Sequence, residues 1–347
     1  MRSMSQPTLR LLDCTLRDGG YQTGWRFSDD LLASYLSLCA AMDLDVVEIG
    51  YLNLAESGAH SIAANGSFKN VPDSLTLAQR ELLEASSLNA AVMVEARNVA
   101  AIGLTAASQA ILAAISRAPL GIRIVRIAAT LNQLPLAAEL ARLLDAAQRS
   151  PIINLMQAAD LPQTQLLDEL NRHLADVPLA ALYFADSFGR MRPCQVRELF
   201  KTLGLAASVP LGFHAHNNLG LAVVNANAAI EGGAQYIDGT FGGIGRGAGN
   251  AATESLYHLT EGKECANAMD LCDLFLAGHI EPLRDSLRWG PSPAYRCQAL
   301  SGVHPTYAQR LVERQNLTDI NRIQILQKIS VHKNARTFED QTLAEFV

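Results

Sequence analysis

Cysteine is scarce in this 347-residue chain, which has 6 cysteines and no CxxC pair. Neither a disulfide framework nor a cysteine-based zinc site is therefore expected. Long basic runs are also lacking and the net charge is −6, which argues against nucleic acid or an anionic membrane surface as the main partner. No stretch of about 18 apolar residues free of charge occurs, and the opening MRSMSQPTLR contains no apolar signal-peptide core. We expect a soluble cytoplasmic protein.

What the chain does have is a large apolar fraction, 49%, much of it in short runs of β-forming residues. These runs lie at Leu11–Cys14, Val46–Gly50, Ala90–Val94, Ile122–Ile127, Ile152–Met156, Ala181–Ala185, Leu211–His216 and Tyr236–Gly239. Most of the intervals between them carry a helical pattern, which indicates βαβ units and a parallel sheet. Eight such units over about 250 residues match the size of a TIM (β/α)8 barrel.

A doubly wound open sheet is the competing architecture. It more often shows GxGxxG after its first strand, whereas here the first run is followed by RDGGYQ. We therefore predict an α/β fold in which residues 1–262 form a TIM barrel.

Beyond Asn250 the strand pattern stops. Amphipathic helical patterns occupy 271–287, 305–315 and 317–329, broken by WGPSP and GVHP. We predict that residues 263–347 form a helical C-terminal domain. The stretch 52–80 lacks clear periodicity and follows the second strand on the active-site side of a barrel, so it is either a substrate-covering loop or a tolerated surface excursion.

His214 and His216 lie two residues apart on the seventh predicted strand, so both side chains point to the same face. Two neutral imidazoles and one carboxylate suit a borderline or hard divalent cation with positions left open for water or substrate. Asp18, in the segment DCTLRDGG after the first strand, can supply the carboxylate. The alternative is a pair of hydrogen-bonded core histidines, but two histidines on one face at a strand end, with Asp18 available, favour metal.

Arg17 and Glu48 are charged residues beside or within apolar strands. Buried charges need partners, and Glu48 in VVEIG, one strand away, is the natural partner for Arg17. A fixed cation beside a divalent metal is what a developing enolate oxygen needs. The alternative is a purely structural network of Arg17, Asp18 and Glu48.

The glycine-rich segment GGIGRGAGN spans residues 242–250. It matches a phosphate cradle only weakly, because neither GK[ST] nor GxGxxG follows a first strand. Its alternative role is a tight loop that closes the barrel. Asn250 is either the N-cap of the next helix or a neutral oxygen ligand for the metal.

The motifs DCTLRDGG, VVEIGY, ADSFG, FHAHNNLGLAVVNANAAIEGG and GAGNAATE resemble those of the metallolyase superfamily. This group comprises pyruvate aldolases, 3-hydroxy-3-methylglutaryl-CoA lyase, and the isopropylmalate and homocitrate synthases. HAHNNLG followed by GxGAGN looks most like 4-hydroxy-2-oxovalerate aldolase. DCTLRDGGYQTGW and GVHPTYAQRLVERQNLTDINRIQ are closer still to bacterial proteins described only by an aldolase catalytic domain.

The resemblance implies a TIM-barrel class II aldolase that forms or cleaves a C–C bond between pyruvate enolate and an aldehyde. It implies a divalent metal, Mn²⁺ or Mg²⁺, with these ligands: Asp18, His214, His216 and Asn250. Arg17 would bind the enolate oxygen and Glu48 would orient Arg17. Ser187, which follows the sixth strand, would contact the substrate carboxylate.

The general base departs from the family pattern. In the hydroxyoxovalerate aldolases a histidine follows the RDG motif, whereas this chain has Gly20-Tyr21, and a tyrosine of their C-terminal domain aligns with His304. We hypothesise that the pair is exchanged, with His304 as general base or acid and Tyr21 positioning it, because a histidine has a suitable pKa. The alternative is that His304 caps or packs within the helical domain.

Two other functions remain as alternatives at this point. One is an acyl-CoA-dependent condensing acyltransferase or a CoA lyase on the same metal site, although the synthases usually read RDGEQ and the lyases carry a cysteine in the glycine-rich loop. The other is a non-catalytic binding module.

The resemblance also implies small-molecule 2-oxo acid and aldehyde substrates and an acylating aldehyde dehydrogenase as a candidate partner, and we expect a homo-oligomer. The residues do not specify the aldehyde.

Overall fold

The computed structural model describes residues 9–54, 66–157, 162–206, 208–260 and 266–347. Its eight parallel strands close into a barrel in the order β1-β2-β3-β4-β5-β6-β7-β8. The strands are β1 (Arg10–Asp13), β2 (Val46–Tyr51), β3 (Ala90–Glu95), β4 (Ile122–Ala129), β5 (Ser150–Leu155), β6 (Ala181–Asp186), β7 (Leu211–Ala215) and β8 (Tyr236–Gly239). All eight predicted runs are therefore strands, and the TIM barrel is confirmed.

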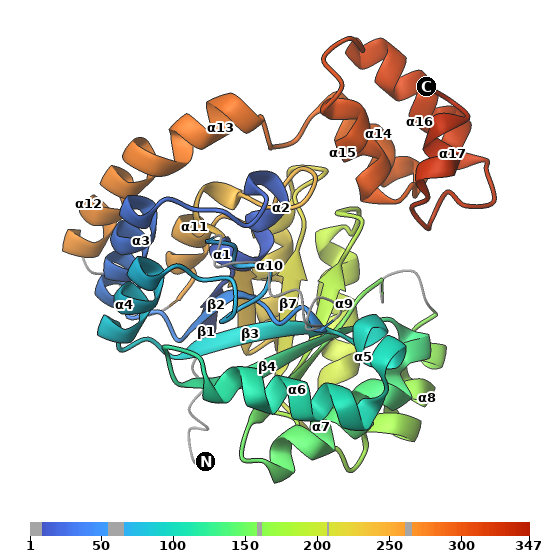
Figure 1. Cartoon of the computed structure of the whole chain (residues 1–347). Helices are drawn as coiled ribbons and strands as arrows, with labels where there is room; N and C mark the ends of the chain where they lie inside the picture. Colours follow the sequence, from blue (N-terminus) through green and yellow to red (C-terminus); the bar gives the residue numbers. More distant parts are fainter. Residues whose placement is uncertain (1–8, 55–65, 158–161, 207, 261–265) are drawn as a thin grey trace, which may run out of the picture.

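Helices surround the barrel, as Figure 1 shows. After the short α1 (Thr15–Asp18) and α2 (Gly20–Thr23) they are α3 (Asp29–Ala41), α4 (Leu77–Ala85), α5 (Ala96–Ile102), α6 (Leu104–Ser116), α7 (Leu134–Ala146), α8 (Gln163–Leu174), α9 (Pro193–Ala206), α10 (Ala222–Glu231) and α11 (Thr253–Tyr257). Local sequence explains where several begin: the Ser28 hydroxyl accepts from Leu31 N at the start of α3, and Thr76 and Gln79 form a capping box at α4.

The barrel interior has two layers, because alternate residues of each strand point inward. One apolar cluster lies mainly toward the strand starts, with Cys14 just after the end of β1 as an exception: Leu12, Cys14, Val46, Ala91, Ile124, Ile152, Ala181, Tyr183 and Tyr236. Two residues after Val46, Ile124 and Tyr236 come the buried Glu48, Arg126 and Asp238, and His214 on β7 is buried as well. The polar layer thus lies toward the carboxyl ends, where TIM barrels carry their active sites.

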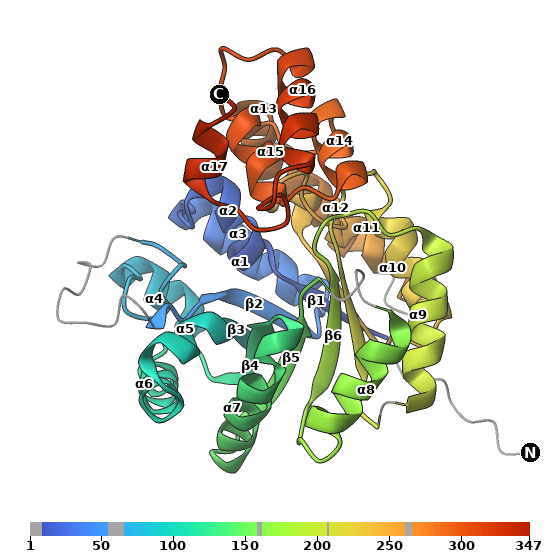
Figure 2. The same cartoon turned by 90° about the vertical axis from the view of Figure 1, so that its right-hand side faces the viewer.

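The C-terminal helices fall into two groups. The first consists of α12 (Ala266–Phe275), the π-helical η5 (Leu276–Ile280) and α13 (Glu281–Leu287). Cys272, Phe275 and Ile280 of this group pack into the barrel's main apolar core, as does Trp289. The second consists of α14 (Pro293–Ser301), α15 (Pro305–Val312), α16 (Asp319–Ser330) and α17 (Asp340–Ala344). It has an apolar cluster of its own and lies above one end of the barrel in Figure 2.

No single helix among the described residues is long and apolar enough to cross a membrane. The pair α5 and α6 reaches that length and composition only together, and it is bent by 117°. The predicted excursion 52–80 falls partly outside the described residues, which omit 55–65.

Candidate active site

Arg17 and Asp18 lie on α1, directly after β1, and both are buried. Asp13 at the end of β1 holds this turn in place: its Oδ1 accepts from Thr15 N at 2.8 Å and from the Tyr35 hydroxyl at 2.6 Å. The carboxyl end of the first strand therefore carries two fixed charged side chains, as the barrel prediction requires.

Asp18, His214 and His216 come together at the carboxyl ends of β1 and β7. Each offers a ligand atom, and these atoms lie within 4.8 Å of one another. The two imidazole centroids are 5.0 Å apart with the rings nearly perpendicular, at 86°. The set matches the expected two-histidine, one-carboxylate arrangement, which suits a divalent cation.

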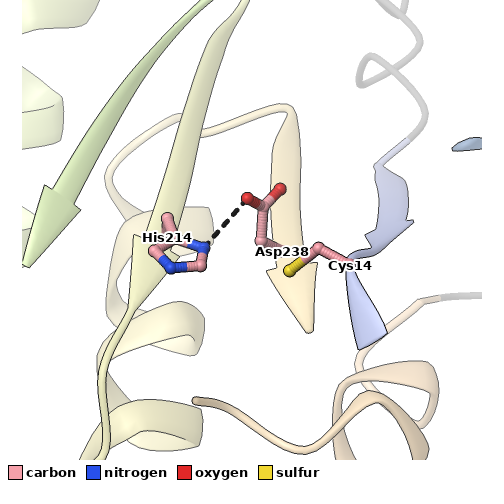
Figure 3. Close-up of side chains that lie close together, drawn as sticks. All are labelled: Cys14, His214 and Asp238. Atoms are coloured by element: carbon pink, nitrogen blue, oxygen red, sulfur yellow. Dashed lines mark hydrogen bonds and ion pairs between the residues drawn. The ribbon is translucent and has the colours of Figure 1, made fainter. Parts of the chain in front are cut away.

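Hydrogen bonds occupy the Nδ1 atom of each histidine and leave Nε2 as the candidate ligand atom. His214 Nδ1 is 3.0 Å from Asp238 Oδ2 (Figure 3), and His216 Nδ1 is 3.3 Å from the Gly249 carbonyl oxygen. Both partners are acceptors, so Nδ1 carries the proton and Nε2 has the lone pair that a metal needs. Sequence reasoning missed this role of Asp238.

Cys14, His214 and Asp238 form a second cluster of potential ligands, drawn in Figure 3. Burial raises the pKa of the Cys14 thiol well above its usual value, and its Sγ donates to Gly239 O at 3.3 Å. His214 Nδ1 already pairs with Asp238. A protonated thiol is a poor ligand, so the Asp18 set is the better metal candidate.

Asn250 completes the Asp18 set. Its Nδ2 donates to Asp18 Oδ2 at 2.5 Å, while its buried Oδ1 has no hydrogen-bond partner among the described residues. Such an orphaned oxygen beside two imidazoles and a carboxylate fits a divalent metal. Asn250 is not the N-cap of the following helix, because α11 begins at Thr253 with Ala252 before it. That alternative is wrong.

Asp18 is held in its charged form. Burial alone would raise the pKa of this carboxyl, but the Arg17 guanidinium, followed by His216 and His214, lowers the pKa below its usual range. Burial and the nearby Arg246 guanidinium lower the pKa of His216, so its imidazole is neutral. Both groups are therefore in the protonation state that a metal ligand requires.

A chain of buried ion pairs runs from the candidate metal ligands across the barrel. Arg17 Nε donates to Glu48 Oε2 at 2.7 Å, and Arg126 Nη1 donates to the same oxygen at 3.0 Å. Arg126 Nη2 then reaches Asp238 Oδ2 at 2.6 Å. The expected pairing of Arg17 with Glu48 is present. Arg126 was missed, although a charge inside the apolar run IRIVRIAA is the same signal that singled out Glu48.

Arg17 keeps one group free. Its Nη1 contacts Asp18 and its Nε contacts Glu48, but the buried Nη2 has no hydrogen-bond partner within the described part of the chain. A buried unpaired donor costs free energy, about 1–3 kcal/mol. A donor of this kind beside a candidate metal set is available to a ligand oxygen.

Ser187 lies just beyond β6 and is buried. Its hydroxyl oxygen accepts from Gln157 N at 3.1 Å, which leaves the hydroxyl proton available to a ligand. Asp186 holds the same turn by accepting from Arg190 N at 3.1 Å and Met191 N at 3.0 Å, and burial raises its pKa to about 6.

His304 and Tyr21 are not hydrogen-bonded to each other in the regions that the structure describes. His304 precedes α15, and its Nδ1 accepts from Thr306 N at 3.3 Å, so it does cap a helix. The Tyr21 hydroxyl lies 3.2 Å from that of Tyr51. Burial, with the Arg246 and Arg97 charges, lowers the pKa of His304 to about 3, which leaves its imidazole neutral and its Nε2 protonated.

Barrel and site together define the class: a TIM-barrel enzyme with its reactive groups at the carboxyl ends of the strands. The chain belongs to the HMGL-like family, whose model matches residues 8–280.

Relatives narrow the class further. A 4-hydroxy-2-oxovalerate aldolase from Carboxydothermus hydrogenoformans is 31% identical over 249 residues, covering 72% of this chain and 69% of the relative. One from Thermomicrobium roseum is 29% identical over 336 residues, covering 93% and 89%. The N-terminal domain of a candidate aldolase from Bacteroides vulgatus shares the fold, with a TM-score of 0.72 and 24% identity over 88% of this chain and 97% of that one. The chain is a carbon–carbon lyase of the aldolase type.

Proposed function

We propose that the protein is a divalent-metal-dependent aldolase that splits a 4-hydroxy-2-oxo acid into pyruvate and an aldehyde, or joins the two. The observation that carries this proposal is the unpaired Arg17 Nη2 beside the Asp18, His214 and His216 set. The names of the relatives support it over an acyl-CoA condensation.

The donor set fits a divalent cation, with Asp18, His214 and His216 as ligands and Asn250 Oδ1 as a fourth. The cation, Mn²⁺ or Mg²⁺, would supply Lewis-acid polarisation of the 2-oxo acid's carbonyl.

Arg17 stabilises negative charge in this account. When the bond between C3 and C4 breaks, its electron pair becomes the enolate of pyruvate, and Arg17 Nη2 donates to the enolate oxygen. Glu48 keeps the guanidinium in place through its ion pair with Arg17, and Arg126 in turn holds Glu48. The Ser187 hydroxyl donates a hydrogen bond to the substrate carboxylate. The enolate then takes up a proton from solvent at C3 and leaves as pyruvate.

His304 accepts the proton of the 4-hydroxyl as that group becomes the aldehyde. The positioning of His304 by Tyr21 stays a prediction, because the Tyr21 hydroxyl pairs with that of Tyr51. The His304 imidazole is neutral at neutral pH, but a pKa of about 3 makes it a weak base in this arrangement, and its lone pair at Nδ1 accepts from Thr306 N, so the role requires the ring to turn or release that cap. Replacing His304 by Asn retains a cap acceptor and should lower kcat by about a hundredfold. Turnover within about threefold of the wild type would contradict the assignment.

The C-terminal helical region then contributes to the site, as Gln309 Nε2 donating to Tyr21 O at 3.3 Å also supports. A boundary between barrel and helical domain at residues 262 and 263 remains a proposal. The packing of Cys272, Phe275 and Trp289 with the barrel core favours one near residue 290. The homo-oligomer and the dehydrogenase partner remain predictions.

The experiment is pyruvate formation, coupled to lactate dehydrogenase, from a panel of 4-hydroxy-2-oxo acids. We expect release with Mn²⁺ or Mg²⁺, none with EDTA, and none from a folded Asp18→Ala variant. Unchanged release by Asp18→Ala, or silence across the panel with metal bound, would contradict the proposal.

A further inference from the structure

Arg246 is the one charged residue of the glycine-rich segment 242–250, and its side chain contacts residues of the candidate active site. Its Nη2 lies 2.9 Å from Ser187 O and 3.2 Å from His216 Nε2. Its backbone N lies 3.4 Å from Asp18 Oδ2. The guanidinium therefore sits between a candidate metal ligand and the residue predicted to bind carboxylate.

The backbone on both sides of Arg246 is fixed. Gln22 Nε2 donates to Gly245 O at 2.7 Å and to Gly247 O at 3.3 Å, the two carbonyls that flank Arg246. Gly245 packs so tightly that an added Cβ would lie 2.6 Å from Asp18 Oδ2. The backbone of Arg246 is therefore fixed, and this backbone position places its side chain in the candidate site.

Among the described residues, the Arg246 guanidinium has no carboxylate partner. No ion pair between described residues includes it, and its contacts in the site are a backbone carbonyl and a neutral imidazole nitrogen. That nitrogen, His216 Nε2, is also the atom that a metal would take. A guanidinium and a divalent cation repel each other at such short range unless an anion lies between them.

We propose that Arg246 binds the carboxylate of the 2-oxo acid and thereby couples the binding of this substrate to the binding of the metal. The inference rests on the proposed function. Arginine suits the task because its planar fork matches a carboxylate with two parallel hydrogen bonds. Thermodynamic linkage makes the effect reciprocal. If the 2-oxo acid increases the affinity for the metal by some factor, the metal increases the affinity for the 2-oxo acid by the same factor. An anionic group on the aldehyde could bind the same guanidinium. The contact of Arg246 with Ser187 O favours the carboxylate of the 2-oxo acid, because Ser187 is the residue expected to contact that carboxylate.

The test is calorimetric titration with Mn²⁺, with and without pyruvate, of the wild type, Arg246→Gln and Arg246→Lys. Without pyruvate, Arg246→Gln should bind Mn²⁺ at least as tightly as the wild type, because a repulsive charge is gone. The gain in Mn²⁺ affinity that pyruvate brings should be smaller in Arg246→Gln by about tenfold. Arg246→Lys, which keeps the charge but not the fork, should lie between the two.

Arg97→Gln is the matched control. Arg97 also acts electrostatically on His304, but it is exposed and paired with Glu95 at 2.5 Å, so its loss should leave the pyruvate gain unchanged. An equal pyruvate gain in the wild type and Arg246→Gln would overturn the proposal. So would loss of Mn²⁺ binding by Arg246→Gln without pyruvate, since that result would mean that Arg246 merely builds the metal site.

Exchange of the pyruvate methyl protons in D2O separates the two anion sources, because it needs no aldehyde. Arg246→Gln should raise KM for pyruvate in this exchange by about tenfold. An unchanged KM for pyruvate with a raised KM for the aldehyde in aldol addition would place the anion on the aldehyde and overturn the proposal. If pyruvate raises the Mn²⁺ affinity of the wild type but its methyl protons do not exchange, the proposed function is wrong while the role of Arg246 stands. If the wild type exchanges these protons and Arg246→Gln does so with the same KM, the role of Arg246 is wrong while the proposed function stands.

Discussion

At the scale of single residues, Arg126 is the side chain on which the buried charge network depends. It lies between Glu48 and Asp238, is fully buried, and stacks 4.5 Å from the ring centre of Tyr183. The chain of contacts makes it a positioning residue for both Arg17 and His214, with no expected contact to substrate.

Arg126→Met should therefore destabilise the protein by about 3–5 kcal/mol, because it leaves two buried carboxylates without their shared cation. Chemical unfolding monitored by circular dichroism measures the change. Arg117→Met is the control: Arg117 pairs with Asp73 at 3.0 Å with both side chains largely exposed, so its loss should cost less than about 1 kcal/mol. Equal effects of the two substitutions would contradict the account.

His304 predicts a dependence of stability on pH. Burial lowers its folded pKa from 6.5 to about 3, so between these values the unfolded chain binds a proton that the folded chain excludes. The wild type should therefore lose stability through this group as pH falls below 6.5. His304→Asn lacks the group, so the Tm of this variant minus the Tm of the wild type should increase as the pH is lowered from about 7 to about 5. A constant Tm difference would mean that His304 is not shielded.

The sequence predicted the residues of the site better than their connections. Asp18, His214, His216 and Asn250 could be found from motifs and strand alternation, and they do come together. Asp238 was overlooked because its role is indirect: it fixes a tautomer of His214 through a contact that no linear spacing reveals.

At the scale of elements, the loop after β8 packs against the candidate metal site. Gly249 adopts φ +83, and an added Cβ would lie 2.0 Å from Gly243 O. A β-carbon at Gly245 would lie 2.2 Å from Asn250 Nδ2 and 2.6 Å from Asp18 Oδ2. The glycines therefore allow the backbone to pack directly against the candidate ligands.

Gly245→Ala should weaken Mn²⁺ binding by about tenfold to a hundredfold, because Asp18 and Asn250 must move. The barrel should still fold, as far-ultraviolet circular dichroism can verify. Gly121→Ala is the matched control, since an added Cβ there meets nothing within 4 Å. If both variants bind Mn²⁺ like the wild type, the loop does not shape the site.

The strands were predictable because β-forming runs recur between helical patterns, and each run became a strand within about two residues of its expected ends. The division of the C-terminal helices was not predictable in the same way. Amphipathic patterns show that a helix has an apolar face, but they do not say which core covers it, and α12 covers the barrel while α14 and α16 cover each other.

At the scale of the whole molecule, the C-terminal helices are joined to the loops that build the site. Asn218 Nδ2 donates to Gln298 Oε1 at 2.5 Å, and both residues are buried. Ala248 of the glycine-rich segment packs into the apolar cluster of these helices. The helical region above the barrel in Figure 2 is therefore placed by the same segment that carries Arg246 and Asn250.

The central claim is that this barrel uses a metal held by Asp18, His214 and His216 to form the enolate of pyruvate. Its most direct test is the exchange of pyruvate methyl protons in D2O, followed by mass spectrometry, with Mn²⁺, with EDTA, and with Asp18→Ala. The account predicts exchange that needs both the metal and Asp18. Exchange that persists in EDTA or in Asp18→Ala, or its absence from wild-type protein with Mn²⁺ bound, would contradict it.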